Sequence, residues 1–151
     1  MARWKIKNVG MKGVSMAVPE NVVKTSDFDF VSQEEAEVFD NTVGIRRRHI
    51  APDNMCASDM CQAAAEKLLE ELGWERDSID VLLFESVTGD YRTPPTSCIL
   101  QDRLALSENC FCMDIPMGCC GCMYAITVAG NLLTTGNVKR ALLLIGDTAL
   151  R

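Results

Sequence analysis

Three cysteines stand together where an apolar run gives way to a turn containing proline and glycine. They are Cys119, Cys120 and Cys122, and they follow the stretch from Asn109 to Gly118. Small and apolar residues then continue at helical spacing, which predicts that Cys119 lies at or near the first turn of a helix. Unpaired backbone N–H groups and the positive end of the helix dipole favour a thiolate over a thiol there. Such a thiolate is suited to acyl transfer, and equally to dithiol redox chemistry.

Two other interpretations of these thiols come from their spacing. Cys110, Cys112, Cys119 and Cys122 offer four thiolates, but their C-x-C and C-x-x-C spacing is not that of a usual zinc site. Cys119 and Cys122 form a C-x-x-C pair at a strand-to-helix junction, as in a dithiol redox protein. The pair lies deep in the chain and lacks a preceding aromatic residue, which disfavours redox use. The remaining cysteines suit packing as small apolar side chains.

The composition excludes several classes of function. The chain has 151 residues, enough for one domain with a core, and 48% of them are hydrophobic. Its N-terminus is polar, and the apolar run Ala141–Ile145 is far too short to span a bilayer. We therefore expect a cytoplasmic protein with reduced cysteines, no membrane partner and no metal. The net charge of −6 argues against a nucleic-acid partner.

The one basic cluster is Arg46, Arg47 and Arg48. It suits either the solvated face of a strand or a contact with an anionic substrate or an acidic carrier. Alternation along a strand sends Arg46 and Arg48 to one face and Arg47 to the other, which weakens it as an anion site.

The elements that must position these residues follow from periodicity. From Ser58 onward, helical and apolar strand-like segments alternate, which favours a mostly parallel sheet with helices packed on it. Ser58 is expected to cap the first long helix, and Gly73 to end it. The expected strands are Trp4–Val18, Arg46–Ala51, Val81–Phe84, Phe111–Ile115 and Ala141–Ile145, and the expected helices are Ser26–Phe30, Ser32–Phe39, Ser58–Trp74, Thr96–Leu106 and Cys119–Thr135. A core strand so close to the C-terminus suggests a fragment of a longer protein.

Several of these segments, in the same order, resemble the beta-ketoacyl-acyl carrier protein synthase III family of the thiolase fold. Val43–Ala51 is similar to that family's T-G-I-x-x-R-x-I-A segment, and Ser58–Ala65 to its first long helix. Ser78–Phe84 is similar to a family strand, and Pro94–Gln101 to its P-S-x-A-x-x-x-Q helix. Asp114–Cys122 matches the D-hydrophobic-x-x-x-C-x-G-F pattern except at its last position. Within that pattern Cys119 occupies the nucleophile's position, which leaves Cys120 and Cys122 to packing.

The resemblance implies a fold, a reaction and partners. The α/β chain would be one half of the layered αβαβα fold, with residues 1–151 forming the N-terminal thiolase-like domain and the C-terminal repeat absent. The resemblance implies a homodimer that initiates fatty acid biosynthesis without a cofactor, by decarboxylative condensation of an acyl-CoA with malonyl-acyl carrier protein. Cys119 would carry the acyl group, its backbone N–H is a candidate oxyanion donor, and Thr93 would border the acyl pocket. The family's catalytic His and Asn come from the second half, so this chain alone is expected to be inactive.

Departures from the family pattern keep alternatives open. Pro116 and Cys122 replace the usual residues around the nucleophile, while Val38 and Thr42 stand where the family has a Trp and an Arg that contact CoA. The acyl donor could therefore differ from a CoA ester. The alternatives are a related condensing enzyme of secondary metabolism or long-chain condensation, a redox protein using Cys119 and Cys122, and a non-enzymatic partner subunit.

Overall fold

The computed structural model describes residues 5–149, which form two compact units. The larger unit holds the described residues up to Ala17 together with Cys56–Asp147, and the smaller holds Val18–Met55 and the described residues from Thr148. Within residues 5–149, none of the helices combines the length and apolarity that crossing a membrane requires.

The larger unit is built on a parallel sheet of three strands. They are β3 (Val81–Glu85), β4 (Phe111–Ile115) and β5 (Ala141–Ile145), with β3 in the middle. All five residues of β3 are buried, as expected for a strand covered on both faces. The register places Glu85 opposite both Ile115 and Ile145, so the three strands end together at one edge.

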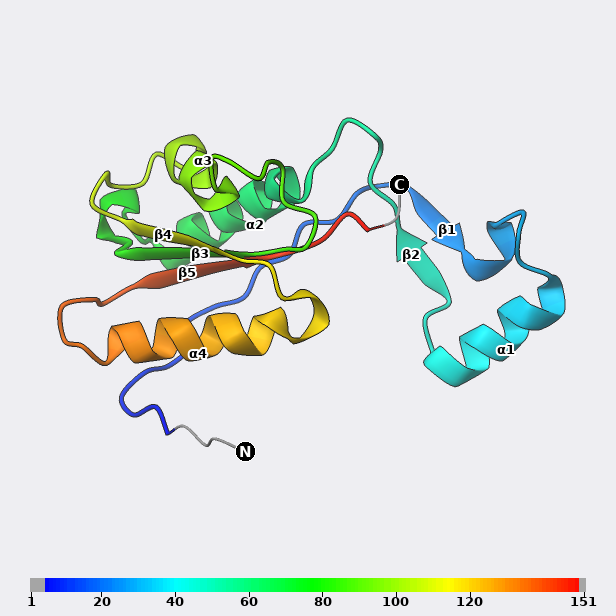
Figure 1. The fold of residues 1–151 in the computed structure, drawn as a ribbon, viewed down its shortest axis with the longest axis horizontal. Coiled ribbons are helices and arrows are strands. Elements are labelled where there is room, and N and C mark those ends of the chain that lie inside the picture. The colour runs from blue at the N-terminus through cyan, green and yellow to red at the C-terminus, as the bar shows by residue number, and fades with distance from the viewer. Residues whose placement is uncertain (1–4, 150–151) are drawn as a thin grey trace. The chain divides into compact units, whose positions relative to one another are not determined.

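Helices cover both faces of this sheet (Figure 1). Helices α2 (Ala57–Leu72) and α3 (Thr96–Arg103) pack on one face, where Leu82 and Phe84 join their apolar side chains in one core cluster. Helix α4 (Gly121–Leu133) covers the other face, where Ala125 and Ala129 meet Val81 and Leu83. The predicted parallel sheet with packed helices is therefore confirmed.

Helix α2 begins differently from the prediction. The helix starts at Ala57 with Cys56 as N-cap residue, and the Asp59 carboxylate accepts the N–H of Cys56 at 2.7 Å. The expected cap, Ser58, is instead buried and donates its hydroxyl to Asp90 at 2.6 Å. Its tertiary partner lies outside the helix, which is why the prediction of a Ser58 cap is wrong. Gly73 ends the helix with φ +61°, as predicted.

The predicted strand Trp4–Val18 is wrong over residues 5–18, which form no strand; Trp4 lies outside the described residues. Within the larger unit, Ile6 lies against Gly130 of α4, and Gly13 lies against Leu68 of α2. This part of the chain is held by helix side chains. It has an alternating pattern but no ladder of backbone hydrogen bonds, which a strand needs.

The smaller unit contains an antiparallel pair, β1 (Val22–Lys24) with β2 (Arg47–His49), a 3₁₀ turn η1 (Thr25–Asp27) and helix α1 (Gln33–Val43). Ser32 caps α1, in a capping box with Glu35. The expected helix Ser26–Phe30 is only the turn η1, strand β2 is shorter than the predicted Arg46–Ala51, and β1 has no counterpart among the predicted elements.

Helices α3 and α4 are shorter than predicted. Helix α3 ends at Arg103 rather than Leu106, because Ala105 turns the chain with φ +49°. Helix α4 starts at Gly121 rather than Cys119, after the 3₁₀ turn η3 (Gly118–Cys120). A second such turn, η2 (Arg76–Ser78), precedes β3.

Candidate active site

The carboxyl edge of the parallel sheet gathers the loops that follow β3, β4 and β5. Asp147, just after β5, ties the loop after β3: its Oδ1 accepts the hydroxyl of Ser86 at 2.9 Å and the backbone N–H groups of Val87 and Thr88 at 2.8 and 3.1 Å. Burial raises the pKa of Asp147, but these hydrogen bonds outweigh it, so the pKa lies below its usual value. In open α/β sheets this edge is where ligands bind.

Asp114 in β4 connects that strand to helix α3, which follows the loop after β3. Its two carboxylate oxygens accept the backbone N–H groups of Thr96 and Ser97, each at 2.8 Å, at the start of α3. A carboxylate at this point satisfies donors that the helix itself leaves unpaired. The strand that leads to Cys119 is thereby fixed to α3.

Cys119 lies in the turn η3 that joins β4 to α4. The turn is closed by a hydrogen bond from the backbone N–H of Gly121 to the carbonyl of Gly118, and just before it the N–H of Met117 donates to the carbonyl of Ile115 at 3.1 Å. Gly118 has φ +64°, a left-handed conformation that a residue with a Cβ adopts only at a cost. Cys119 is exposed and is followed within two residues by the first turn of α4. The expected strand–turn–helix setting of this thiol is present.

The neighbouring thiols differ in exposure. Cys120, which we expected to serve in packing, is exposed, and its Sγ lies 3.4 Å from the carbonyl oxygen of Met117. Cys122 is half-buried. Cys110, directly before β4, is buried in the α2–α3 core, and Cys112 within β4 packs against that core. Burial raises the pKa of Cys112 to about 12, so its thiol stays protonated at neutral pH.

All eight cysteines are free thiols in the structure. Across residues 5–149, no three His, Cys, Asp or Glu side chains are grouped in a way that could hold a metal ion.

Thr93, the expected acyl-pocket residue, lies in the loop between β3 and α3, directly before Pro94. The loop begins where β3 ends, so it starts at the same sheet edge as the turn of Cys119. Thr93 itself is exposed.

Glu85 is the residue that the sequence pattern did not reveal. It ends β3, is only 3% exposed, and its Oε1 has no hydrogen-bond partner among the described residues. Burial, foremost, and the nearby Asp147 raise its pKa, while the backbone N–H groups of Met117 and Gly118 oppose that rise. A charged residue directly after the apolar run Val81–Phe84 was the available signal.

The basic cluster and the histidine belong to the smaller unit. The guanidinium of Arg48 lies 4.9 Å from the centre of the Phe39 ring and donates to the hydroxyl of Thr25 at 3.1 Å. Arg46 and Arg47 are exposed. His49, the single histidine, is hydrogen-bonded through Nδ1 to the carbonyl of Pro19. Arg48 therefore has structural partners, which favours the strand-face interpretation over an anion site.

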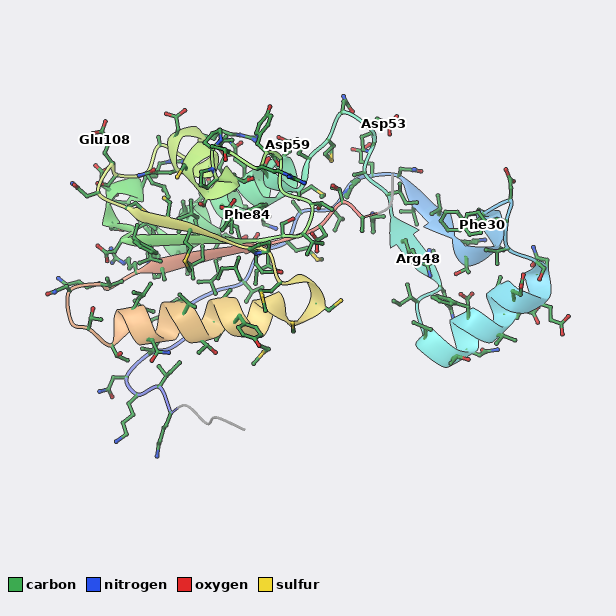
Figure 2. All side chains as sticks on the ribbon, viewed as in Figure 1. Phe30, Arg48, Asp53, Asp59, Phe84 and Glu108 are labelled. Atoms are coloured by element: carbon green, nitrogen blue, oxygen red, sulfur yellow. The ribbon has the colours of Figure 1, made fainter. Side chains whose placement is uncertain are left out.

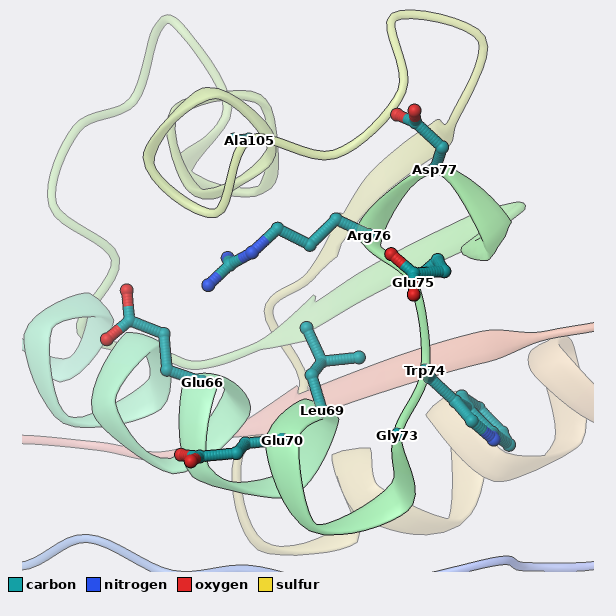
Figure 3. A pocket seen from close by; sticks show the side chains of 9 residues that line it. All are labelled: Glu66, Leu69, Glu70, Gly73, Trp74, Glu75, Arg76, Asp77 and Ala105. Atoms are coloured by element: carbon teal, nitrogen blue, oxygen red, sulfur yellow. The ribbon is translucent and has the colours of Figure 1, made fainter.

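A pocket opens elsewhere on the larger unit, beside the end of α2 (Figure 3). Arg76 extends across it and donates to the carbonyl oxygen of Leu104 at 2.6 Å, and four acidic side chains line it. None of its lining residues comes from the loops at the carboxyl edge. We therefore place the candidate active site at Cys119 and not in this pocket.

Together, the fold and the site define a class: an α/β unit with an exposed cysteine on a strand-to-helix turn at the carboxyl edge of a parallel sheet. No family model matches the chain. Several curated proteins, however, are similar to it in sequence. The beta-ketoacyl-[acyl-carrier-protein] synthase III of Geobacillus kaustophilus is 35% identical over 138 residues, and that of Xanthomonas oryzae pv. oryzae is 33% identical over 139 residues.

These alignments cover 91% and 92% of this chain but only 44% and 42% of the relatives. The chain thus spans less than half the length of the curated relatives it matches. A crystal structure of a 3-oxoacyl-(acyl-carrier protein) synthase from Burkholderia xenovorans LB400 superimposes with a TM-score of 0.76 at 38% identity, covering 87% of this chain and 40% of that one.

The chain is therefore similar in sequence to the beta-ketoacyl-[acyl-carrier-protein] synthase III enzymes, and its fold corresponds to one half of theirs. The expectation of one half of a thiolase-like α/β fold is confirmed.

Proposed function

We propose that the intact protein is an acyltransferase of the beta-ketoacyl-acyl carrier protein synthase III type. It condenses the acyl group of an acyl-CoA with malonyl-acyl carrier protein, the step that initiates fatty acid biosynthesis. The observation that carries the proposal is the exposed Cys119 on the β4–α4 turn, in a chain whose relatives bear that enzyme's name.

The chemistry follows from the thiol. The Cys119 thiolate attacks the thioester carbon of the acyl-CoA, the CoA thiolate leaves, and an acyl-Cys119 thioester remains. The malonyl group then loses CO₂, and its carbanion attacks the acyl carbon while the Cys119 thiolate departs. Thiolate suits this sequence because it is both a good nucleophile and a good leaving group. The backbone N–H of Cys119 is our candidate donor to the oxyanion, and no cofactor takes part.

We place this chain as the N-terminal half of a two-repeat enzyme that acts as a cytoplasmic homodimer. The groups that stabilise decarboxylation, a His and an Asn, would come from the second repeat. His49 is a poor substitute, because its Nδ1 is hydrogen-bonded to the carbonyl of Pro19. We therefore expect no 3-oxoacyl product from the 151-residue chain by itself, and product formed by that chain would contradict this placement.

A product assay on the intact protein tests the proposed reaction. Incubation with an acyl-CoA and malonyl-acyl carrier protein should give 3-oxoacyl-acyl carrier protein and CO₂. Cys119→Ser should abolish the product, whereas the matched variant Cys120→Ser, altered at the next exposed thiol, should retain it. Product formed equally well by Cys119→Ser would refute the role of Cys119. Condensation with a different acceptor would favour a condensing enzyme of another pathway.

The small side chain of Thr93 bears on the choice of acyl group. We propose that Thr93 borders the acyl pocket and leaves room for chains longer than acetyl. A panel of acyl-CoA donors of increasing length should then include substrates beyond acetyl-CoA, and Thr93→Phe should shift the preference towards acetyl. An intact enzyme that accepts acetyl-CoA alone would refute the assignment.

A further inference from the structure

Glu85 occupies a position where a carboxyl group is costly. The four preceding residues of β3 are apolar and buried, and Glu85 is itself 3% exposed. A polar group so buried is unfavourable unless hydrogen bonds replace its water. Its Oε1 has no hydrogen-bond partner among the described residues. Leu or Val at this position would fit the run of residues before it, so stability alone does not explain a glutamate.

What surrounds the carboxyl group is the turn that carries Cys119. On the N-terminal side of Cys119, the backbone N–H groups of Met117 and Gly118 interact with the Glu85 carboxylate. On its C-terminal side, a Cβ added to Gly121 would collide with Cγ, Cδ and Oε1 of Glu85. Glu85 therefore contacts the chain both before and after Cys119.

The glycine at position 121 makes this close approach possible. Helix α4 contains a second glycine in tight contact, Gly130, whose added Cβ would meet Ile6. The two contacts differ in kind. The Ile6 atom closest to that Cβ is the terminal methyl Cδ1, which can turn aside, whereas at Gly121 the added atom would meet most of a buried carboxyl group that also faces the turn.

We propose that Glu85 is a positioning residue for Cys119: it braces the β4–α4 turn through the amides of Met117 and Gly118 and through contact with Gly121. The inference rests on the proposed role of Cys119 as acyl nucleophile. A brace of this kind fixes the backbone that aims the thiol and its N–H at the thioester. Misplacement of a reacting group by about 1 Å can cost on the order of 100-fold in rate.

Two readouts on the intact protein test the brace. The first is the single-turnover rate of Cys119 acylation by an acyl-CoA, as a function of donor concentration. We expect Glu85→Leu to lower the saturating rate about tenfold or more while the half-saturating concentration changes little. Glu85→Gln, which keeps an acceptor oxygen for the two amides, should restore most of the rate.

The glycine pair provides a test that leaves Glu85 in place. Gly121→Ala should slow acylation as Glu85→Leu does, because the carboxyl group must move away from the turn. Gly130→Ala is the matched control in the same helix and should acylate at the wild-type rate. Wild-type rates in both Glu85→Leu and Gly121→Ala would overturn the proposal, as would a loss in Glu85→Leu that Glu85→Gln fails to restore.

The second readout separates this inference from the proposed function. Alkylation of Cys119 by iodoacetamide, followed peptide by peptide, needs no acyl donor. If the wild-type protein accepts no acyl group on Cys119, the proposed function fails. The proposed role of Glu85 is then judged by alkylation alone. It is supported if Glu85→Leu and Gly121→Ala change the pH profile of Cys119 alkylation while Glu85→Gln and Gly130→Ala leave it unchanged. It is refuted if the profiles of all four variants coincide with that of the wild type.

Discussion

Strand β3 begins directly after one acidic residue, Asp80, and ends on another, Glu85, and the two ends are held in opposite ways. At the amino end, the Asp80 carboxylate accepts the backbone N–H groups of Lys139 and Arg140 at 2.7 and 3.0 Å, which lowers its pKa. At the carboxyl end, burial is the largest cause that raises the pKa of Glu85.

This difference shows which of the two acidic residues stabilises the fold. Asp80 anchors the segment that leads into β5, and its own backbone N–H and carbonyl bond to Arg140 and Phe111. Its hydrogen-bonding capacity is used to align strands. Glu85 lies against the turn of Cys119, and its Oε1 has no hydrogen-bond partner among the described residues. A satisfied carboxylate stabilises, whereas a buried and incompletely satisfied one usually marks a site where stability is given up for function.

The largest expected effect is on the free energy of unfolding, and it tests whether both ends of β3 depend on the same hydrophobic core. Phe84, 1% exposed, lies between them on β3 and packs with the α2–α3 cluster (Figure 2). Phe84→Ala should lower the free energy of unfolding by about 3–5 kcal/mol, because it removes a large buried ring and leaves a cavity. Urea unfolding of the intact protein measures this. Phe30→Ala is the control: Phe30 is 83% exposed, and its loss should change stability by no more than about 0.5 kcal/mol. Equal effects of the two variants would contradict the assigned core.

A smaller loss of stability is expected for a substitution at the amino end of β3. Asp80→Ala removes the acceptor of two backbone N–H groups and should lower the free energy of unfolding by about 1–2 kcal/mol at pH 7. The exposed Asp53→Ala serves as control in the same urea titrations. If Asp80→Ala were as stable as the control, the hydrogen bonds at this end would contribute nothing, and the contrast with Glu85 would disappear.

The smallest effect is a difference in pH dependence. Because the folded pKa of Glu85 is raised above 4.5, its ionisation costs stability as the pH rises from 4.5 through the folded pKa. Glu85→Gln should therefore gain stability relative to the wild type over that interval and no further above it. The lowered pKa of Asp80 acts with the opposite sign: its contribution is present above 3.8 and is lost as the pH falls through the folded pKa.

Unfolding free energies of the wild type, Glu85→Gln and Asp80→Ala, compared between pH 3 and 8, give both curves. A difference between Glu85→Gln and the wild type that stays constant across this range would show that Glu85 ionises as freely in the folded protein as in the unfolded one.

In the larger unit, the local sequence pattern was enough to predict the elements that have turn residues at both ends. Strands β4 and β5 match their predicted limits, because each is an apolar run between turn residues. Gly73 was predictable because a helix that ends in a left-handed residue favours glycine. The setting of Cys119 was predictable for the same local reasons.

Features that depend on distant partners were not predictable. Ser58 looks like an N-cap until its bond to Asp90 is known, and residues 5–18 alternate like a strand although helix side chains hold them. The site of Glu85 is of this kind. Its neighbours in the chain indicate only a strand end, while Met117, Gly118 and Gly121, which give it a role, lie more than thirty residues further along.

The most direct test of Cys119 as acyl nucleophile is peptide-resolved mass spectrometry of the intact protein after incubation with an acyl-CoA and no acceptor. We expect one acyl adduct per chain, located on Cys119 by fragmentation, absent from Cys119→Ser and unchanged in Cys120→Ser. An unmodified Cys119, an adduct on Cys120 or Cys122 in its place, or a Cys119–Cys122 disulfide without an adduct would contradict the assignment.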